Sequence, residues 1–101
     1  MVYDAVDCDV PMTGNVLLDF YADWCVPCQA IRPIFDRLSR QYSGIKFMKV
    51  NVDYNQEMAD MFTVRSIPTI LFLREGEEMD RAVGTLHEST IVDKIRRAFR
   101  Q

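Results

Sequence analysis

Two cysteines stand close together in the first third of the chain, in the run Cys25-Val26-Pro27-Cys28. Two thiols at this spacing can exchange a disulfide with another protein, or they can supply two of the ligands of a zinc ion. A disulfide that closes so short a loop restricts the unfolded chain by only about 2 kcal/mol, so stability is a weak reason for the spacing. The pair therefore points to redox or metal chemistry.

Zinc is the alternative to redox chemistry at this pair. A structural zinc ion needs four ligands, and Cys8 and His87 would have to complete the set. Neither of these residues belongs to a second closely spaced ligand pair, and the Cys25–Cys28 segment follows a strand and opens a helix. The placement favours redox chemistry and predicts no metal site. Cys8 is interpreted as an inert small hydrophobic residue, and the alternative is a regulatory or dimer-forming thiol.

The predicted helix gives the two thiols different roles. Its amino-terminal end carries a partial positive charge, which stabilises a thiolate, and the thiolate is the attacking form of cysteine. We expect Cys25, at the very start, to be the more exposed and more acidic thiol and to attack a substrate disulfide. We expect Cys28, one turn later and turned inward, to resolve the mixed disulfide.

Asp19 lies in the strand that precedes the dithiol. It shares one face of that strand with Leu17 and Tyr21, so we expect it to be buried and its carboxyl pKa to be raised. A buried carboxyl near two thiols can act as the general base that takes the Cys28 proton, through a water molecule. The alternative is a carboxylate that reaches solvent at the strand end. Lys49, on the following strand, is expected to lie beside Asp19 and tune it, or else to be solvated.

Ile67-Pro68-Thr69 opens a strongly apolar strand. Proline cannot donate a hydrogen bond to a sheet, so its position at a strand entry is unusual. Peptide bonds before proline are where cis isomers occur, and the sequence alone leaves the isomer open.

The remaining sequence predicts one α/β domain that spans residues 1–101. The 101 residues are 49% hydrophobic and 27% charged, with a formal net charge of −3, which is typical of a globular chain without an electrostatic reason to bind nucleic acid. No apolar run is long enough to span a membrane, and the start lacks the pattern of a secretory signal. Hydrophobic periodicity predicts strands at 2–6, 15–22, 45–53, 69–73 and 79–83, and helices from about 27 to a stop at 44, at 56–63 and from about 89.

The order of these motifs resembles the thioredoxin family. The run Asp-Phe-Tyr-Ala-Asp-Trp-Cys-Val-Pro-Cys at residues 19–28 is similar to its active-site segment. Pro33, the run Lys-Val-Asn-Val-Asp at 49–53, the run Val-Arg-Ser-Ile-Pro-Thr at 64–69 and Gly84 follow in the family's order, so the resemblance covers residues 15–101. It implies a thioredoxin-like fold: a mixed central sheet of four to five strands, flanked by helices on both faces.

The resemblance also implies an activity and a set of site residues. The chain would be a protein-disulfide reductase, an electron carrier that needs no cofactor beyond the Cys25–Cys28 disulfide and is itself reduced by a thioredoxin reductase. Asp19 would match the family's buried acid and Pro68 its cis-proline, which faces the dithiol. Substrate would contact a surface made by Trp24, Val26, Pro27, Ile67, Pro68, Val83 and Gly84.

Three features depart from the family pattern. Val26 stands where the family usually has glycine, Tyr21 stands where many members have a second tryptophan, and residues 1–14 are too few for the family's opening strand and helix. We therefore expect the first helix to be shortened or missing.

Two other functions remain as alternatives. Oxidases and isomerases of this fold tend to have a thiolate-stabilising residue between the cysteines, and Val26-Pro27 offers none. A binding module or zinc protein would be expected to have lost a cysteine, Asp19 or Pro68. The small odd number of cysteines favours a reducing, cytoplasmic compartment. We expect a monomer whose partners are a thioredoxin reductase and disulfide-bearing client proteins, with no nucleic acid and no membrane.

Overall fold

The chain folds into one five-stranded sheet with helices on both faces, as a computed structural model shows for residues 1–5, 9–11, 13–84 and 87–100. The strand order is β1-β3-β2-β4-β5, and the pairs β1–β3 and β3–β2 are parallel whereas β2–β4 and β4–β5 are antiparallel. The predicted thioredoxin-like mixed sheet is confirmed. The strands are β1 (Val2–Asp4), β2 (Asn15–Tyr21), β3 (Ile45–Asn51), β4 (Thr69–Arg74) and β5 (Glu77–Val83).

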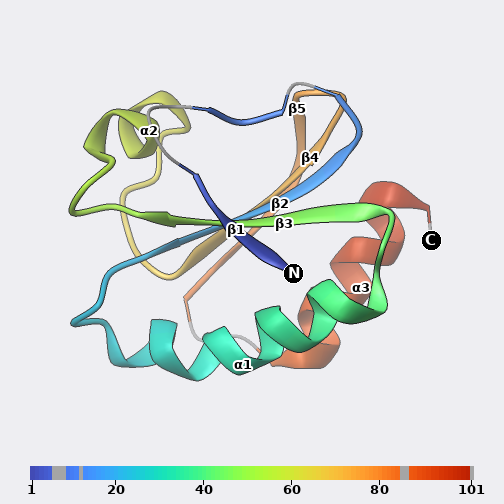
Figure 1. Cartoon of the computed structure of the whole chain (residues 1–101), viewed down its shortest axis with the longest axis horizontal. Helices are drawn as coiled ribbons and strands as arrows, with labels where there is room; N and C mark the ends of the chain where they lie inside the picture. Colours follow the sequence, from blue (N-terminus) through green and yellow to red (C-terminus); the bar gives the residue numbers. More distant parts are fainter. Residues whose placement is uncertain (6–8, 12, 85–86, 101) are drawn as a thin grey trace.

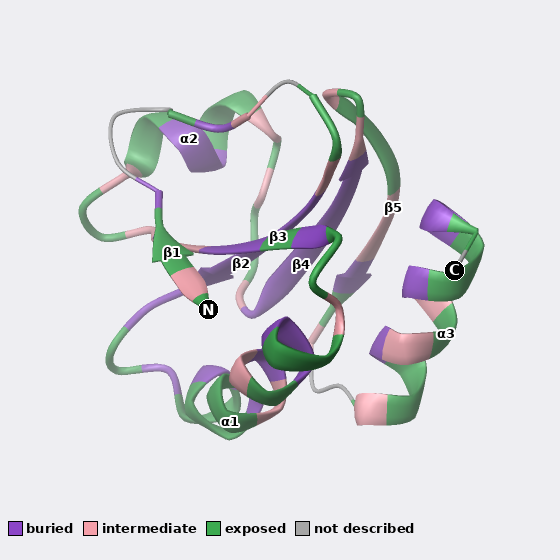
Figure 2. Ribbon diagram, turned by 45° about the vertical axis from the view of Figure 1, so that its right-hand side comes forward, coloured by how far each residue is buried: buried purple, intermediate pink, exposed green. Residues whose placement is uncertain are grey.

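Three helices cover the sheet in the structure that is described. They are α1 (Val26–Gln41), α2 (Gln56–Met61) and α3 (Glu88–Phe99). Figure 1 shows α1 and α3 on one side of the sheet and α2 on the other. In α1 and α3 the buried residues face the sheet and the exposed residues face solvent (Figure 2), as the hydrophobic periodicity of these helices predicts.

Strand β2 is the centre of the sheet and separates two cores. Its side chains alternate between the faces, and from Val16 to Tyr21 all are buried. Leu17 joins the core beneath α1 and α3, which also contains Phe35 and Phe47 in edge-to-face contact. Leu18 and its neighbours on the opposite face join the core beneath α2. The two cores hold β2 in a fixed register, and this register places the segment that follows β2.

Helix α1 begins directly at the dithiol. Cys25 is its N-cap and Pro27 lies in its first turn, where the missing N–H group does no harm. The helix continues past Pro33 and ends at Gln41 with Tyr42 as its C-cap. The expected stop at Gly44 is therefore wrong by three residues. The chain leaves the helix earlier because the Tyr42 carbonyl accepts a hydrogen bond from Ile45, the first residue of β3.

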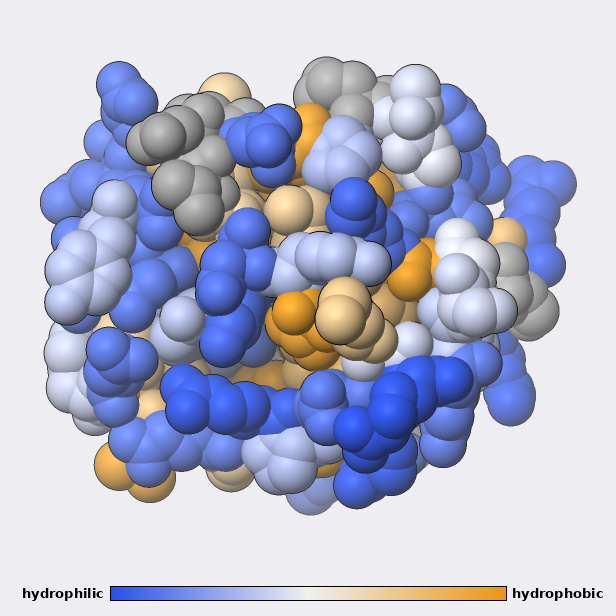
Figure 3. Space-filling model, viewed as in Figure 1, coloured by the Kyte–Doolittle hydropathy of each residue, from blue (hydrophilic) through white to orange (hydrophobic). Residues whose placement is uncertain are grey.

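The opening segment is short, as the sequence predicts. Strand β1 pairs with β3, and the described residues between β1 and β2, which are 5, 9–11, 13 and 14, form no helix. Cys8 lies outside the described residues. The face of the molecule in Figure 3 is largely hydrophilic; hydrophobic side chains gather near its middle, and others show near the upper middle and at the lower left edge.

Candidate active site

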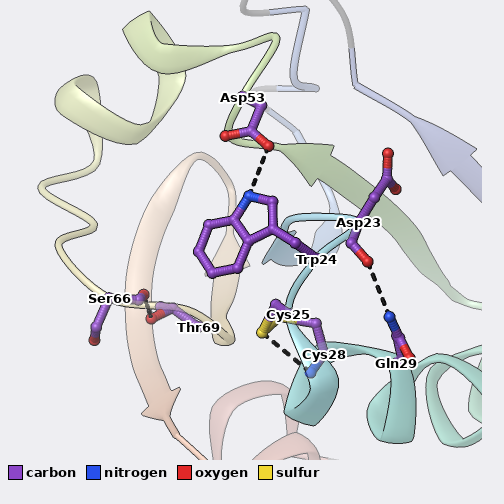
Figure 4. The surroundings of a disulfide bond; sticks show 8 residues. All are labelled: Asp23, Trp24, Cys25, Cys28, Gln29, Asp53, Ser66 and Thr69. Carbon is purple, nitrogen blue, oxygen red and sulfur yellow. Dashed lines mark hydrogen bonds between the residues drawn. A yellow bond between two sulfur atoms is a disulfide. The ribbon is translucent and has the colours of Figure 1, made fainter.

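Cys25 and Cys28 form a disulfide at the start of α1 (Figure 4). Their Cα atoms are 5.3 Å apart, and the Cys28 backbone N–H donates to Cys25 Sγ at a distance of 3.3 Å. The Cys25 sulfur therefore sits where a helix stabilises negative charge. Both residues are buried, with 5% of Cys25 and 2% of Cys28 exposed. Cys25 is therefore more exposed than Cys28, as expected, but the difference is very small in the disulfide form.

The loop that leads to the dithiol is held from two sides. Trp24 Nε1 donates to Asp53 Oδ2 at 3.0 Å, and Gln29 Nε2 donates to the Asp23 carbonyl at 2.9 Å (Figure 4). The Trp24 ring nevertheless lies at the surface beside the disulfide, and 69% of the residue is exposed. The contact with Asp53 was not predicted from the sequence, because Asp53 lies 29 positions further along the chain than Trp24.

A cis peptide bond joins Ile67 and Pro68, which settles the isomer that the sequence left open. Ile67 packs against the group formed by Tyr21, Ala22 and the two cysteines. The Thr69 hydroxyl donates to the Ser66 carbonyl at 2.7 Å, and this hydrogen bond spans the turn that contains Ile67 and Pro68. Strand β5 reaches the same place, since the Gly84 N–H donates to the Pro68 carbonyl at 2.9 Å. Of the residues predicted for the substrate surface, Ile67 thus lies against the dithiol, and a backbone hydrogen bond joins its neighbour Pro68 to Gly84.

Exposure divides the predicted substrate-contacting residues into two groups. Val26 and Val83 are exposed by 72% and 52%, and Pro27 is exposed as well. Ile67 and Gly84 are half-buried, and Pro68 is buried. The apolar side chains of Trp24, Val26 and Val83 are therefore free for contact with another protein, whereas Ile67 and Pro68 offer mainly backbone.

Asp19 is buried beneath the dithiol, as its position in β2 predicts. It is 5% exposed, and its Oδ1 atom has no hydrogen-bond partner among the described residues. Burial raises the pKa of Asp19 from 3.8 to about 7, against the opposing effects of Arg32 and Lys49. A carboxyl group with such a pKa exchanges protons at neutral pH, which is the property that a general base needs.

A cavity of about 580 Å³ connects Asp19 with Cys28. It lies between α1 and the sheet, and Tyr21, Arg32 and Lys49 line it as well. The volume is large enough for several water molecules, so a water molecule can lie between the Asp19 carboxyl group and Cys28. The predicted pairing of Lys49 with Asp19 is confirmed at the level of register, because the two residues are partners in the β2–β3 ladder.

Arg32 was not found from the sequence. It lines the same cavity. The charge of Arg32 lowers the pKa of Asp19 more than the charge of Lys49 does. Its position four residues after Cys28 places both side chains on one side of α1, and this spacing was the signal available in the sequence.

The site is chemically suited to thiol–disulfide exchange. It joins two cysteines in a disulfide, a helix N-terminus beside the Cys25 sulfur, a buried carboxyl group that lines a cavity with Cys28, and an exposed apolar rim. Among the described residues, no three His, Cys, Asp or Glu side chains are grouped so that they could hold a metal ion. His87 is the N-cap of α3 instead.

The sequence model of one protein family, thioredoxin, matches residues 5–97. The chain belongs to the thioredoxin family. The match includes the site residues from Asp19 to Gly84 and the elements that position them.

Known proteins agree with this assignment. The chain is 40% identical over 89 residues to thioredoxin 1 of the cyanobacterium Nostoc, which covers 87% of this chain and 79% of that protein. It is 43% identical over 81 residues to an M-type chloroplastic thioredoxin of Pisum sativum, covering 79% of this chain and 47% of the pea protein. The X-ray structure of Fasciola hepatica thioredoxin superimposes with a TM-score of 0.81 at 35% identity, covering 86% of this chain and 84% of that one.

Family membership establishes the class of reaction. The chain is a thiol–disulfide oxidoreductase that reduces protein disulfides, and its redox group is its own disulfide, so it needs no cofactor. Its partners, in general terms, are a thioredoxin reductase and disulfide-bearing target proteins. In the part of the chain that the structure describes, no helix has the length and apolar character needed to cross a membrane.

Proposed function

We propose that the protein reduces client disulfides through Cys25 as the attacking thiol and Cys28 as the resolving thiol. The observation that supports this order is the hydrogen bond from the Cys28 N–H to Cys25 Sγ at the start of α1. In the reduced protein the same N–H group and the helix end favour the Cys25 thiolate over its thiol. Cys28 lies further into the first turn and is buried.

The reaction follows from these positions. The Cys25 thiolate attacks one sulfur of a client disulfide, which breaks the client bond, forms a Cys25–client bond and releases the other client sulfur as a thiolate. The Cys28 thiol then loses its proton and attacks Cys25 Sγ. The Cys25–Cys28 disulfide forms, and the second client sulfur leaves with the electron pair. The client gains two electrons, and the protein loses them.

Asp19 takes the Cys28 proton in this proposal. The carboxyl group and Cys28 line one cavity, and a water molecule in that cavity can relay the proton to the carboxylate. A base with a pKa of about 7 is half in its accepting form at neutral pH. Lys49 assists by favouring the carboxylate electrostatically, since its pKa-lowering effect on Asp19 is the third contribution after burial and Arg32.

Clients bind, we propose, across the rim of the dithiol. An extended client segment pairs with the backbone at Ile67, next to cis-Pro68, in the manner of an added strand. Trp24, Val26 and Val83 supply exposed apolar contacts on either side of that segment, and Pro27 and Gly84 complete the surface. The branched Val26 side chain changes the shape of this surface relative to glycine, so it is expected to affect the choice of clients.

The cellular setting belongs to the proposal as well. We place the protein in the cytoplasm as a monomer that forms a single domain over residues 1–101. A thioredoxin reductase supplies its electrons, and it contributes to electron transport and to cell redox homeostasis. The low cysteine content supports a reducing compartment.

Insulin reduction tests the two cysteine roles. With dithiothreitol as donor, wild type should cleave insulin disulfides and Cys25→Ser should lose the activity. Cys28→Ser should instead form a stable mixed disulfide through Cys25, because attack occurs and release does not. The trapping is performed with Cys8→Ser also present, and Cys8→Ser alone is the control and should keep the wild-type rate. Full activity of Cys25→Ser, or trapping through Cys28, would overturn the proposed order.

A further inference from the structure

Arg32 occupies a defined place at the Asp19 cavity. Its guanidinium carbon lies 5.6 Å from the centre of the Tyr21 ring, and Lys49 Nζ lies 5.8 Å from the same ring centre. Tyr21 and Asp19 are two residues apart in β2 and therefore point to the same face. The two cations therefore contact one aromatic ring, on the face of β2 that carries the buried carboxyl group.

The other charged groups around Asp19 are already engaged. Lys49 forms an ion pair with Asp4 of β1 at 3.7 Å, and this acid offsets part of the Lys49 charge. On α1, Asp36 pairs with Arg40 at 2.6 Å. The Met1 ammonium group donates to Ser39 Oγ at 3.1 Å, and on β4 the residue opposite Asp19 is the apolar Ile70.

Arg32 differs from Lys49 in this respect. Among the described residues, none of the ion pairs involves Arg32, so no paired acid offsets its charge. The side chain is exposed, and contact with the Tyr21 ring fixes where the charge lies. Cys28, Arg32 and Asp19 line the same cavity.

We propose that Arg32 is a positioning residue for disulfide reduction, in that its guanidinium group, seated on Tyr21, keeps the Asp19 carboxylate available at neutral pH to receive the Cys28 proton. This inference rests on the proposed role of Asp19 as the base. The proton moves from Cys28 Sγ to the Asp19 carboxylate, and the resulting thiolate attacks Cys25 Sγ and expels the client thiolate. Arg32 touches none of the reacting atoms and acts only through its charge.

The direction of the effect follows from the charge. Burial raises the pKa of Asp19 to about 7, and Arg32 opposes that rise. Removal of the charge lifts the pKa further, so less of the carboxyl group is in its accepting form at pH 6.5. Above pH 9 the carboxyl group is ionised with or without Arg32, and the rates converge. Salt screens an exposed charge, so high ionic strength should weaken the effect.

Single-turnover oxidation of the reduced protein by excess insulin tests the proposal between pH 5.5 and 9.5. Trp24 is the sole tryptophan and lies beside the dithiol, so its fluorescence reports the reaction. Arg32→Gln should be slower than wild type by about two- to fivefold at pH 6.5, the range typical of exposed charge pairs. It should match wild type at pH 9.5, with its rate inflection at higher pH.

Three further variants separate charge from structure. Arg32→Lys keeps the charge and should restore most of the rate. Arg37→Gln removes the same charge from another side of α1, where Arg37 pairs with Glu88, and should leave the pH profile unchanged. Asp19→Asn should lose the inflection that the Asp19 carboxyl group contributes. The pKa of the Asp19 carboxyl group can also be measured by infrared titration of each protein in its disulfide form. It should be lowest in wild type, higher in Arg32→Lys and highest in Arg32→Gln.

The outcomes test the role of Asp19 and the role of Arg32 separately. If Asp19→Asn loses the inflection and Arg32→Gln keeps it at the wild-type pH, Asp19 is the base and the role of Arg32 is overturned. A uniform slowing of Arg32→Gln at every pH, without rescue by lysine, would show a structural role and would also overturn it. If Asp19→Asn keeps the wild-type profile, the base assignment fails and the Arg32 proposal fails with it.

Discussion

Leu18 and Asp19 are neighbours in β2, yet they face two different environments. Leu18 is completely buried in the apolar core beneath α2, among side chains such as Val50 and Met58. Asp19 is almost as deeply buried, but it faces a cavity beneath α1 and has a carboxylate oxygen without a partner among the described residues. One strand thus supports a sealed core on one face and a reactive cavity on the other.

The difference shows how the molecule divides stability and function. The α2 face gains free energy from close apolar packing. On the α1 face the packing is interrupted near the dithiol, and the ionised form of Asp19 is costly to bury. In the proposed mechanism the same carboxyl group takes the Cys28 proton, and this role would account for the cost. Changes at these two positions should therefore have opposite effects on stability.

The largest effect is expected for Leu18→Asn. The substitution removes a buried aliphatic side chain and leaves an amide group without partners in an apolar core. Together these should lower the free energy of unfolding by about 4 kcal/mol or more. Urea denaturation at pH 7, followed by circular dichroism, measures the loss.

Leu18→Met is the matched control at the same site. Its volume is similar, so its cost should stay below about 1.5 kcal/mol. A loss for Leu18→Asn no greater than that for Leu18→Met would show that the α2 face is not a sealed apolar core.

Asp19→Asn should stabilise the protein, and the gain should depend on pH. The native pKa of about 7 lies above the ordinary value of 3.8, so the native state holds the proton more tightly than the unfolded chain. The contribution of Asp19 to the wild-type free energy of unfolding is therefore complete below about pH 4, and it declines as the pH rises to 7. The advantage of Asp19→Asn should grow over that interval and reach at most about 4 kcal/mol at pH 8, since each pKa unit is worth about 1.4 kcal/mol.

Denaturation curves at pH 4, 6 and 8 for both proteins measure that advantage. Asp23→Asn, which removes a carboxylate from an exposed position, should change stability by no more than about 0.5 kcal/mol. An advantage of Asp19→Asn that is constant across pH, or that falls as pH rises, would contradict the burial of an ionisable Asp19.

Much of this site was predictable from the sequence because its signals are local. Alternation along β2 predicted that Asp19 is buried on the face of Leu17, and the position of Pro27 predicted the start of α1 at the dithiol. The proline at the entry to β4 indicated an unusual backbone, and the resemblance implied the cis isomer that the structure contains.

The remaining features depend on contacts between distant segments. The hydrogen bond from Trp24 to Asp53 and the contact of Arg32 with Tyr21 join residues whose separation along the chain carries no periodic signal. Glycine at position 44 suggested a helix end by its type alone, yet α1 stops earlier at Gln41. Residue type and period specify which elements form, whereas these contacts become visible only when the elements are packed together.

The equilibrium redox potential of the Cys25–Cys28 couple tests the reductase assignment most directly. Strongly oxidising proteins of this fold stabilise the thiolate with added hydrogen bonds or charge, and Val26-Pro27 supplies neither. We predict a potential within about 40 mV of −270 mV, the value of ordinary thioredoxin, when the protein is titrated against glutathione or dithiothreitol buffers. A potential above about −220 mV would contradict the account and move the protein into the range of the disulfide isomerases.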